Sequence, residues 1–312
     1  MTEQAGYENR VFAQSCETME QIPDGVVQTC VTSPPYFGLR DYGVDGQIGL
    51  ESTVDAYVAR MVAVFREVRR TLRDDGVLWI NLGDSYANAS NSGPQGVSGD
   101  RATRTFTASG LRPRIEPGLK PKDLIGVPWR VAFALQADGW WLRSDIIWHK
   151  PNPMPSSVSD RCTSSHEYVF MLSKSDRYFF DADAIAEPSL NAGITFYNKS
   201  GKNKESSNVT QVGFTREGGV TVKETRNKRD VWTIATTPYS HAHFATFPPE
   251  LPTICIRAGS REGDLVLDPF MGSGTVAEVA EGLGRRWVGY EINPAYHELI
   301  AERTRQKGLF TR

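Results

Sequence analysis

Hydrophobic residues recur along the chain with the spacing of alternating strands and helices. Apolar positions at helical spacing predict helices over residues 54–72, 128–137, 249–258, 275–283 and 294–306. Short apolar runs predict strands over residues 26–32, 77–82, 141–149, 167–172, 264–268 and 286–291. Asp74, Asp75 and Gly76 are expected to end the first helix. Strand, helix and strand in succession predict an α/β fold with a mostly parallel sheet.

Two polar, glycine-rich segments interrupt this rhythm and predict long surface loops. Residues 88–122 hold six basic and two acidic residues, and residues 191–230 hold eight basic and four acidic ones. Such local positive charge favours contacts with nucleic-acid phosphates, although solvated surface loops would have a similar composition. The candidate phosphate-binding residues are Arg101, Arg104, Arg112, Arg114, Lys202, Lys204, Arg226 and Lys228.

Composition narrows the class of protein further. The 312 residues are 39% hydrophobic and 23% charged, which excludes a wholly disordered chain. No run approaches the roughly 20 apolar residues of a membrane span, and Glu3 and Glu8 in a polar start argue against a signal peptide. The four cysteines are far apart without a CxxC pair, so we expect no zinc site or disulfide framework. A reducing, cytoplasmic environment fits best.

The strongest motif is a hydrophobic strand that runs into a glycine-rich turn at the start of a helix. Residues 265–275 read LVLDPFMGSGT, and such glycines let a ligand approach the backbone. About twenty residues later, VGYEIN places Glu291 at the tip of the next strand, where it can accept both ribose hydroxyls of a nucleoside. The alternatives are a tight strand–helix turn and a glutamate that caps the helix after Pro294. Together the two motifs favour an adenosine-containing cofactor, and the absence of GxxxxGK[ST] argues against a nucleotide bound by a P-loop.

A second motif, TSPPY, covers residues 32–36 at the end of a predicted strand. The Ser33 hydroxyl and the Pro34 carbonyl can accept hydrogen bonds from one amino group, and Tyr36 can stack on a flat ring. An ordinary Pro-Pro turn is the alternative. Phe37 fits either a wall of this site or the core.

These two motifs resemble the catalytic and cofactor motifs of the amino DNA methyltransferases. Those enzymes transfer a methyl group from S-adenosyl-L-methionine to the exocyclic amino group of cytosine (N4) or adenine (N6). The catalytic motif precedes the cofactor motif, which resembles the β class. Further segments resemble family patterns: residues 46–51, 76–84, 144–151, 166–174, 230–232 and 243–248.

The resemblance implies a Rossmann-like methyltransferase fold with a mostly parallel seven-stranded sheet, one strand being antiparallel, and an inserted DNA-recognition region. Residues 1–180 and 231–312 would form the catalytic domain, and residues 181–230 the target-recognition region. The implied catalytic residues are Ser33, Pro34, Pro35, Tyr36 and Asp84, with helix capping as the alternative role of Asp84. The implied cofactor-binding residues are Asp268, Phe270, Gly272, Ser273, Gly274, Thr275, Glu291, Asn293, His243 and Phe247.

The remaining expectations concern substrate and partners. His241 and His243 form a His-x-His pair, but no carboxylate or cysteine lies close by in sequence, so we expect no metal. Serine before Pro-Pro is associated in the family mainly with cytosine N4 and aspartate with adenine N6, so N4 methylation of double-stranded DNA is expected and N6 methylation is the alternative. Two remoter alternatives are a non-catalytic nucleoside-binding module and a protein-glutamine or RNA methyltransferase, whose relatives usually carry Asn-Pro-Pro-Tyr after the cofactor motif. The family often forms homodimers and often accompanies a restriction endonuclease; the sequence decides neither point.

Overall fold

The computed structural model describes residues 6–87, 118–197, 212–214, 219–236 and 247–305. The chain forms two compact units, Met1–Phe180 with Asp230–Arg312 and the shorter Asp181–Arg229. Several residues predicted to bind phosphate or cofactor lie outside the described residues: Arg101, Arg104, Arg112, Arg114, Lys202, Lys204 and His243, together with His241.

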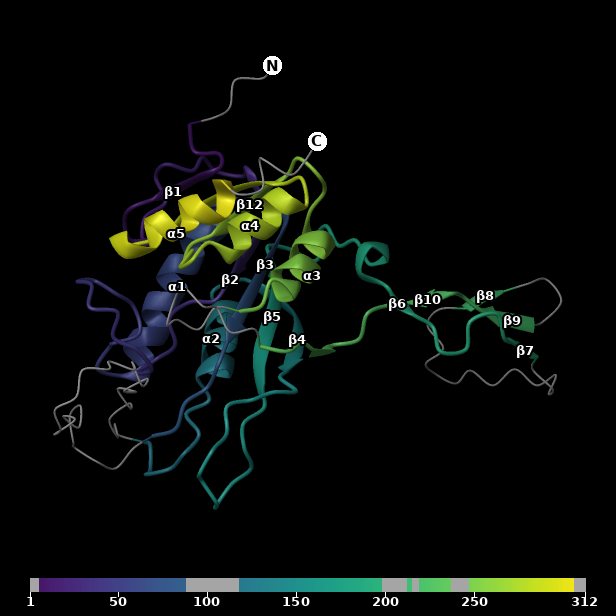
Figure 1. The fold of residues 1–312 in the computed structure, drawn as a ribbon, viewed down its shortest axis with the longest axis horizontal. Helices are drawn as coiled ribbons and strands as arrows, with labels where there is room; N and C mark the ends of the chain where they lie inside the picture. Colours follow the sequence, from purple (N-terminus) through teal and green to yellow (C-terminus); the bar gives the residue numbers. More distant parts are fainter. Residues whose placement is uncertain (1–5, 88–117, 198–211, 215–218, 237–246, 306–312) are drawn as a thin grey trace. The chain divides into compact units, whose positions relative to one another are not determined.

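An eight-stranded sheet forms the centre of the larger unit (Figure 1). Its order is β1 (Arg10–Phe12), β13 (Arg286–Tyr290), β12 (Leu265–Asp268), β2 (Val27–Thr32), β3 (Leu72–Leu82), β5 (His166–Ser173), β4 (Trp141–His149) and β11 (Val231–Thr233). Only β5 runs antiparallel to its neighbours in this sheet, as the family resemblance implied. The expected number of seven strands was wrong. The two outermost strands, β1 and β11, have three residues each, too short to give a periodic hydrophobic signal.

In the part of the chain that the structure describes, five α-helices cover the two faces of this sheet (Figure 1). They are α1 (Val54–Thr71), α2 (Val127–Ala137), α3 (Glu250–Gly259), α4 (Thr275–Gly282) and α5 (Pro294–Arg305). The connection from β2 through α1 leads to β3 on one side, and that from β12 through α4 leads to β13 on the other. Because such crossovers are right-handed, α1 and α4 lie on opposite faces. Helix α2 packs on α1, whereas α3 and α5 pack on α4.

The junction between α1 and β3 differs from the sequence prediction. Thr53 caps the start of α1 by accepting a hydrogen bond from the backbone of Ala56. The helix ends at Thr71 and β3 begins at once, so Asp74, Asp75 and Gly76 lie within the strand. The pairing of β2 with β3 shifts register at this point, and the irregularity leaves both aspartates exposed while the strand continues.

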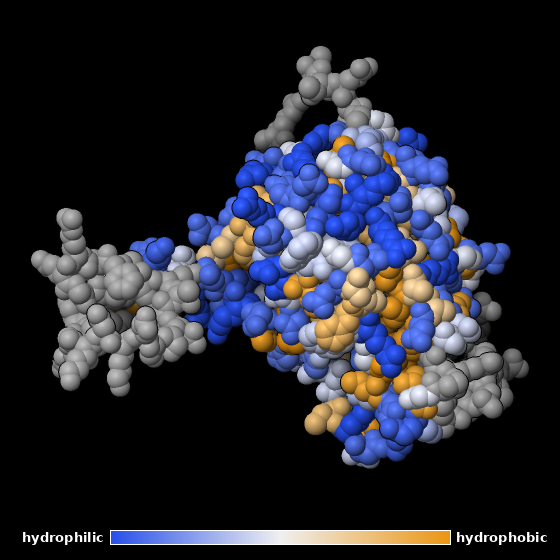
Figure 2. Space-filling model, turned by 180° about the vertical axis from the view of Figure 1, so that it is seen from behind, coloured by the Kyte–Doolittle hydropathy of each residue, from blue (hydrophilic) through white to orange (hydrophobic). Residues whose placement is uncertain are grey.

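The core of the larger unit is mainly apolar. All six residues of β2 and the last seven of β3 are buried. Buried polar side chains gather at the carboxyl ends of the parallel strands, where Thr32, Asn81, Asp268 and Glu291 lie. Desolvated polar groups need partners, so this edge is where chemistry is expected. Seen from behind, the surface is mostly hydrophilic, with apolar residues gathered in its lower half (Figure 2). No described helix is long and apolar enough to cross a membrane.

The shorter unit contains antiparallel strands that the polar sequence did not predict. Strand β6 (Glu187–Pro188) follows a short 3₁₀ helix, η1 (Asp183–Ile185), and pairs with β10 (Thr225–Arg226). Strand β9 (Gly219–Val222) pairs with both β7 (Thr195–Tyr197) and β8 (Val212–Phe214). The Glu187 carboxylate forms ion pairs with three basic side chains, those of Arg226, Lys228 and Arg229. Two of the residues predicted to bind phosphate therefore already contact a carboxylate.

The packing of α3 on the sheet yields a first prediction. A Cβ added at Gly259 would lie 2.6 Å from Thr29 Oγ1 and 2.7 Å from Val77 Cγ2, both shorter than real Cβ contacts. Gly259→Ala is therefore expected to lower the free energy of unfolding by about 1–3 kcal/mol. Gly6→Ala is the matched control, because a Cβ there meets nothing within 4 Å. Urea unfolding measures both, and equal stability of the two variants would contradict the tight packing.

Candidate active site

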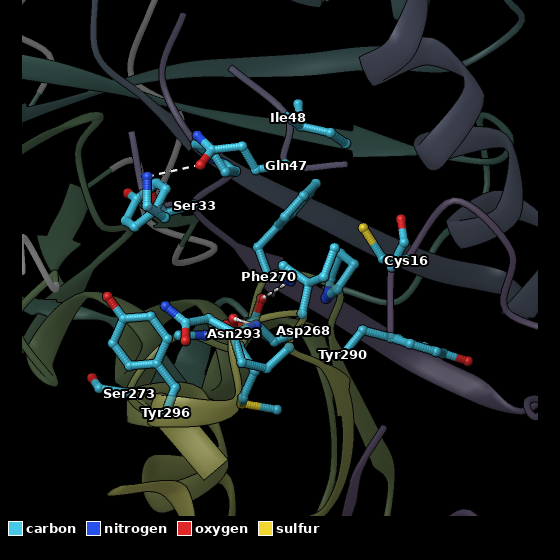
Figure 3. Close-up of a pocket in the computed structure, with 18 of the residues that line it drawn as sticks. Cys16, Ser33, Gln47, Ile48, Asp268, Phe270, Ser273, Tyr290, Asn293 and Tyr296 are labelled. Carbon is cyan, nitrogen blue, oxygen red and sulfur yellow. Dashed lines mark hydrogen bonds between the residues drawn. The ribbon is translucent and has the colours of Figure 1, made fainter. Parts of the chain in front are cut away.

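One pocket opens at the carboxyl ends of four neighbouring parallel strands, β1, β13, β12 and β2 (Figure 3). Strands β12 and β2 are adjacent, and their connections leave in opposite directions. Ligands of open α/β sheets bind at such a switch point. The pocket holds about 1010 Å³ of empty space, part of it open to solvent. Predicted site residues that line it are Ser33, Pro35, Phe247, Asp268, Phe270, Gly272, Ser273, Thr275, Glu291 and Asn293.

A buried hydrogen bond joins the two motifs at the base of the pocket. The Thr32 hydroxyl donates to Asp268 Oδ1 at 2.7 Å, and the backbone N–H of Phe270 donates to the same oxygen at 3.0 Å. Asp268 is only 2% exposed. The pKa of its carboxyl is raised to about 7, mainly by burial and to a smaller extent by the nearby Glu291, and the two hydrogen bonds oppose this rise.

The glycine-rich turn holds its backbone in conformations that favour glycine. Gly272 and Gly274 have φ angles of +51° and +85°, and Gly274 precedes the first residue of α4. A Cβ at Gly274 would also lie 3.2 Å from Ile300 in α5, so the position is sterically tight as well. The N–H of Met271 donates to the Tyr290 carbonyl at 2.9 Å, which attaches the turn to β13.

Glu291 is held with both carboxylate oxygens at the pocket wall. Oε2 accepts the N–H of Gly272 at 2.8 Å, and Oε1 accepts the N–H of Asn293 at 2.7 Å. Burial raises the pKa of this carboxyl, and the two backbone hydrogen bonds oppose the rise. A carboxylate oxygen has two acceptor positions, so each retains capacity for one hydroxyl donor. The alternative role of Glu291 in the sequence analysis was to cap the start of α5. At that helix start the Asn293 side chain accepts the N–H of Ala295.

The pocket is also lined by a buried hydroxyl group without a hydrogen-bond partner among the described residues. The Ser273 hydroxyl is buried and, among the residues that the structure describes, forms no hydrogen bond. Thr275, by contrast, receives a hydrogen bond from Arg303 of α5 at 2.7 Å. A glycine-lined turn, a held carboxylate and a buried free hydroxyl in one pocket fit an adenosine-containing cofactor.

The TSPPY segment lies at the rim of the same pocket. Ser33 and Pro35 line it, whereas Pro34 is buried and Tyr36 faces the neighbouring strand β3. The Tyr36 ring packs so closely on Gly83 that a Cβ there would lie 2.6 Å from it. Its hydroxyl lies 2.7 Å from Glu167 Oε2, a residue to which the sequence assigned no role.

Asp84 and Phe37 make structural contacts. The Asp84 carboxylate accepts the N–H groups of Gly126 and Val127 at 3.0 Å and so caps the start of α2. It does not line the pocket, and its catalytic role stays a prediction. Phe37 is 3% exposed and packs with Tyr57 at 5.6 Å between ring centroids, which confirms its place in the core.

Several pocket residues had no assigned role in the sequence analysis. They are Gln14, Ser15, Cys16, Tyr42, Gly46, Gln47, Ile48, Met271, Ile292 and Tyr296, with Pro269 and Tyr290. The first three follow β1, whose three residues gave no signal. Gly46, Gln47 and Ile48 belong to a segment that resembled the family without an assigned function. Burial raises the pKa of the Cys16 thiol, so it stays protonated near neutral pH.

Comparisons with known proteins agree with this geometry. A family model described as DNA methylase matches residues 27–302. The chain is 47% identical to the type II methyltransferase M.XycI of Xanthomonas campestris pv. cyanopsidis, over 91% of this chain and 83% of that protein. It is 45% identical to the type II methyltransferase M.SmaI of Serratia marcescens, over 94% and 89%.

Solved structures share the fold at lower sequence identity. The PvuII DNA methyltransferase, which is cytosine-N4-specific, aligns with a TM-score of 0.63 and 19% identity, over 96% of this chain and 90% of its own. A DNA modification methylase of Thermus thermophilus, complexed with S-adenosyl-L-methionine and named in its structure as putative, aligns with a TM-score of 0.59 and 22% identity, over 97% and 95%.

The buried carboxyl of Asp268 predicts a pH-dependent stability. Its pKa rises from an ordinary 3.8 to about 7, so within this window the folded protein keeps a proton that the unfolded chain releases. Stability therefore falls as the pH rises through the window. Asp268→Asn keeps an acceptor for Thr32 and removes the titration. Its free energy of unfolding, relative to the parent, should rise by up to a few kcal/mol across the window and then level off.

Urea unfolding of the cofactor-free protein at a series of pH values measures this difference. Asp45→Asn, at an exposed position, is the matched control and is expected to leave the profile unchanged. A constant difference between Asp268→Asn and the parent at every pH would contradict the assignment.

Proposed function

The chain belongs to the DNA methylase family that modifies adenine N6 or cytosine N4, and within it we propose a site-specific cytosine-N4 methyltransferase that uses S-adenosyl-L-methionine. The observation that carries the proposal is the meeting of Ser33 with Asp268 and Glu291 in one pocket. The Ser33 hydroxyl, a hydrogen-bond acceptor, therefore lies in the same pocket as the residues that would bind a nucleoside-type cofactor. The type II methyltransferases of 45–47% identity support a role in site-specific DNA modification.

The cofactor is held by residues from two strands. Glu291 accepts the ribose hydroxyls with the capacity that its two backbone hydrogen bonds leave. Phe247 and Asn293 contribute to the adenine wall, while Phe270, Ser273 and the turn through Gly274 border the methionine part. The Ser273 hydroxyl, which has no hydrogen-bond partner among the described residues, would find a polar partner in the cofactor. His243 belongs to the same proposed set by its sequence motif.

The chemistry is direct transfer to a weak nucleophile. S-adenosyl-L-methionine, when bound, supplies a methyl group on a positively charged sulfur. The amino nitrogen of cytosine has its lone pair delocalised into the ring. Ser33 and the Pro34 carbonyl each accept one of its N–H groups, which favours a more tetrahedral nitrogen with a freer lone pair. The bound cofactor would supply the methyl carbon to this nitrogen and leave as the neutral thioether S-adenosyl-L-homocysteine, and the extra proton of the nitrogen would pass to water.

Positioning and electrostatics supply the acceleration, and no cysteine nucleophile is involved. The target base leaves the duplex to reach the pocket, at a cost of a few kcal/mol, and stacks on Tyr36. Residues 181–230 act as the target-recognition region, and the basic segments contact phosphates. Arg226 and Lys228 would exchange part of their pairing with Glu187 for those phosphates.

The cofactor assignment predicts the effect of removing one carboxylate. Glu291→Ala is expected to weaken binding of S-adenosyl-L-methionine at least about tenfold, because a hydrogen bond to a charged group contributes about 1.5–3 kcal/mol. Isothermal titration calorimetry measures the affinity. Glu298→Ala on α5 is the control, since that glutamate is exposed and does not line the pocket. Equal affinity of both variants would remove Glu291 from the cofactor site.

The choice of base is tested on the product. The purified protein is incubated with S-adenosyl-L-methionine and DNA amplified in vitro, which carries no methylation. Mass spectrometry of the nucleosides is expected to find N4-methylcytosine. N6-methyladenine in its place would contradict the base and leave the family assignment intact, and the absence of both would contradict methyl transfer to DNA.

A further inference from the structure

A chain of polar side chains leads from Ser33 to the far side of β5. The Ser33 hydroxyl lies 3.3 Å from Asn81 Oδ1 and 3.4 Å from the Tyr36 hydroxyl. Tyr36 and the Asn81 amide both donate to Glu167 Oε2, at 2.7 Å and 3.1 Å. Lys150 forms an ion pair with the other oxygen of Glu167. The function proposed above uses only Ser33 and Tyr36 of this network.

The network is largely withdrawn from solvent. Asn81 is 2% exposed, and the side chains of Glu167 and Lys150 are 17% and 18% exposed. Water is therefore a poor competitor for these hydrogen bonds, and each buried donor or acceptor depends on its neighbour in the network. A change from donor to acceptor at one residue therefore alters the hydrogen bonds of the next residue in the network.

The directions of the hydrogen bonds follow from the ends of the network. Glu167, in an ion pair with Lys150, has acceptors only, so Tyr36 and Asn81 must both donate to it. The second amide hydrogen of Asn81 is also used, since Nδ2 donates to the Tyr168 carbonyl at 3.2 Å. Both partners of Nδ2 are acceptors, which fixes the orientation of the amide and turns Oδ1 toward Ser33.

The hydrogen of the Ser33 hydroxyl is thereby left with acceptors that both belong to the network. Tyr36 has a single proton, and the short distance to a charged acceptor favours donation to Glu167. Asn81 Oδ1 and the Tyr36 oxygen then both act as acceptors toward Ser33. The hydrogen of Ser33 points into the network, and the lone pairs of its oxygen remain for the pocket.

We propose that Asn81 and Glu167 are positioning residues that fix the polarity of Ser33, so that its hydroxyl can only accept a hydrogen bond from the amino group of the target base. This inference rests on the proposed function. A hydroxyl free to rotate would donate to the base in part of its orientations and would then leave the amino N–H without an acceptor. The network removes those orientations before the base arrives.

The first test reverses the donors at one position. In Glu167→Gln the side-chain oxygen is required by Lys150, so the new NH₂ group faces the amide of Asn81. The Tyr36 hydroxyl also faces this NH₂ group, accepts a hydrogen bond from it and turns its own hydrogen toward Asn81 Oδ1, 3.1 Å away, so that the hydrogen of Ser33 is displaced into the pocket. With tritiated S-adenosyl-L-methionine and in vitro amplified DNA, the single-turnover rate is expected to fall at least about tenfold, which equals about 1.4 kcal/mol. Cofactor affinity stays at the parent value. Glu20→Gln, the same change at an exposed position, retains the parent rate.

A double-mutant cycle separates this role from general support of the fold. Ser33→Ala lowers the rate by itself. If Glu167 acts through the Ser33 hydroxyl, Glu167→Gln lowers the rate of the Ser33→Ala variant by less than about twofold, because no hydroxyl remains to be oriented. An undiminished loss in that background would overturn the proposal.

The second test makes the network depend on pH. The titratable groups that contact Asn81 are Tyr36 and Glu167, with Lys150 beyond the latter. In Asn81→Asp, the introduced carboxyl is buried beside Glu167, and both effects raise its pKa. Below that pKa it is protonated, donates to Glu167 and accepts from Ser33, as the amide does. Above it, the two carboxylates repel each other and the donor is lost.

The rate of Asn81→Asp, divided by that of the parent, is therefore expected to rise as the pH falls through the mildly acid range. Asn81→Leu stays slow at every pH. A flat ratio for Asn81→Asp, with cofactor affinity and thermal unfolding as in the parent, would overturn the proposal. This variant also serves if Glu167→Gln does not fold. Absence of methyl transfer by the parent itself would instead contradict the proposed function.

Discussion

The hydrogen bond between Thr32 and Asp268 holds the site together. Its two residues lie 236 positions apart in the sequence, yet their side-chain oxygens are 2.7 Å apart and both residues are almost fully buried. Thr32 is followed by Ser33, and Asp268 also accepts the N–H of Phe270 at the start of the glycine-rich turn. One buried carboxyl thus sets the catalytic segment and the cofactor turn relative to each other. The raised pKa of Asp268 reflects its withdrawal from water.

Strand order explains why these groups meet there. The connections after β2 and β12 leave in opposite directions, so the connecting helices α1 and α4 leave the edge between the two strands open. The same edge receives Glu291 from β13 and the residues that follow β1. Thr32, Asn81, Asp268 and Glu291, which would be costly in an apolar core, all have hydrogen-bond partners at this edge.

The single antiparallel strand of the large sheet gives this edge a further property. Because β5 runs against β3, its first residues lie beside the last residues of β3, and Tyr168 pairs with Leu82. Glu167 is thereby brought within hydrogen-bonding distance of Asn81 and Tyr36. A parallel strand in this place would have presented its opposite end. The direction of one strand therefore supplies a charged acceptor to the catalytic segment.

Much of the fold was accessible from the sequence because its signals are local. The apolar spacing of residues 54–72 and the run at 264–268 predicted α1 and β12 closely, since helix and strand periodicities depend only on near neighbours. The glycines at 272 and 274 marked a turn whose positive φ angles require them. The three-residue strands β1 and β11 carried no such signal. Asp74, Asp75 and Gly76 were wrongly expected to end the first helix, because polar residues and glycine also occur where a strand is irregular.

The sequence by itself determined the alternation of strands and helices, the two motifs and the family that they indicate. It could not decide that Asp84 caps a helix that begins 43 residues later, or that Cys16 and Gln47 line the pocket. Nor could it connect Ser33 with Glu167. These contacts join residues with no periodic relation along the chain. Only the order and direction of the strands bring them within hydrogen-bonding distance, because strands far apart in the sequence become neighbours in the sheet.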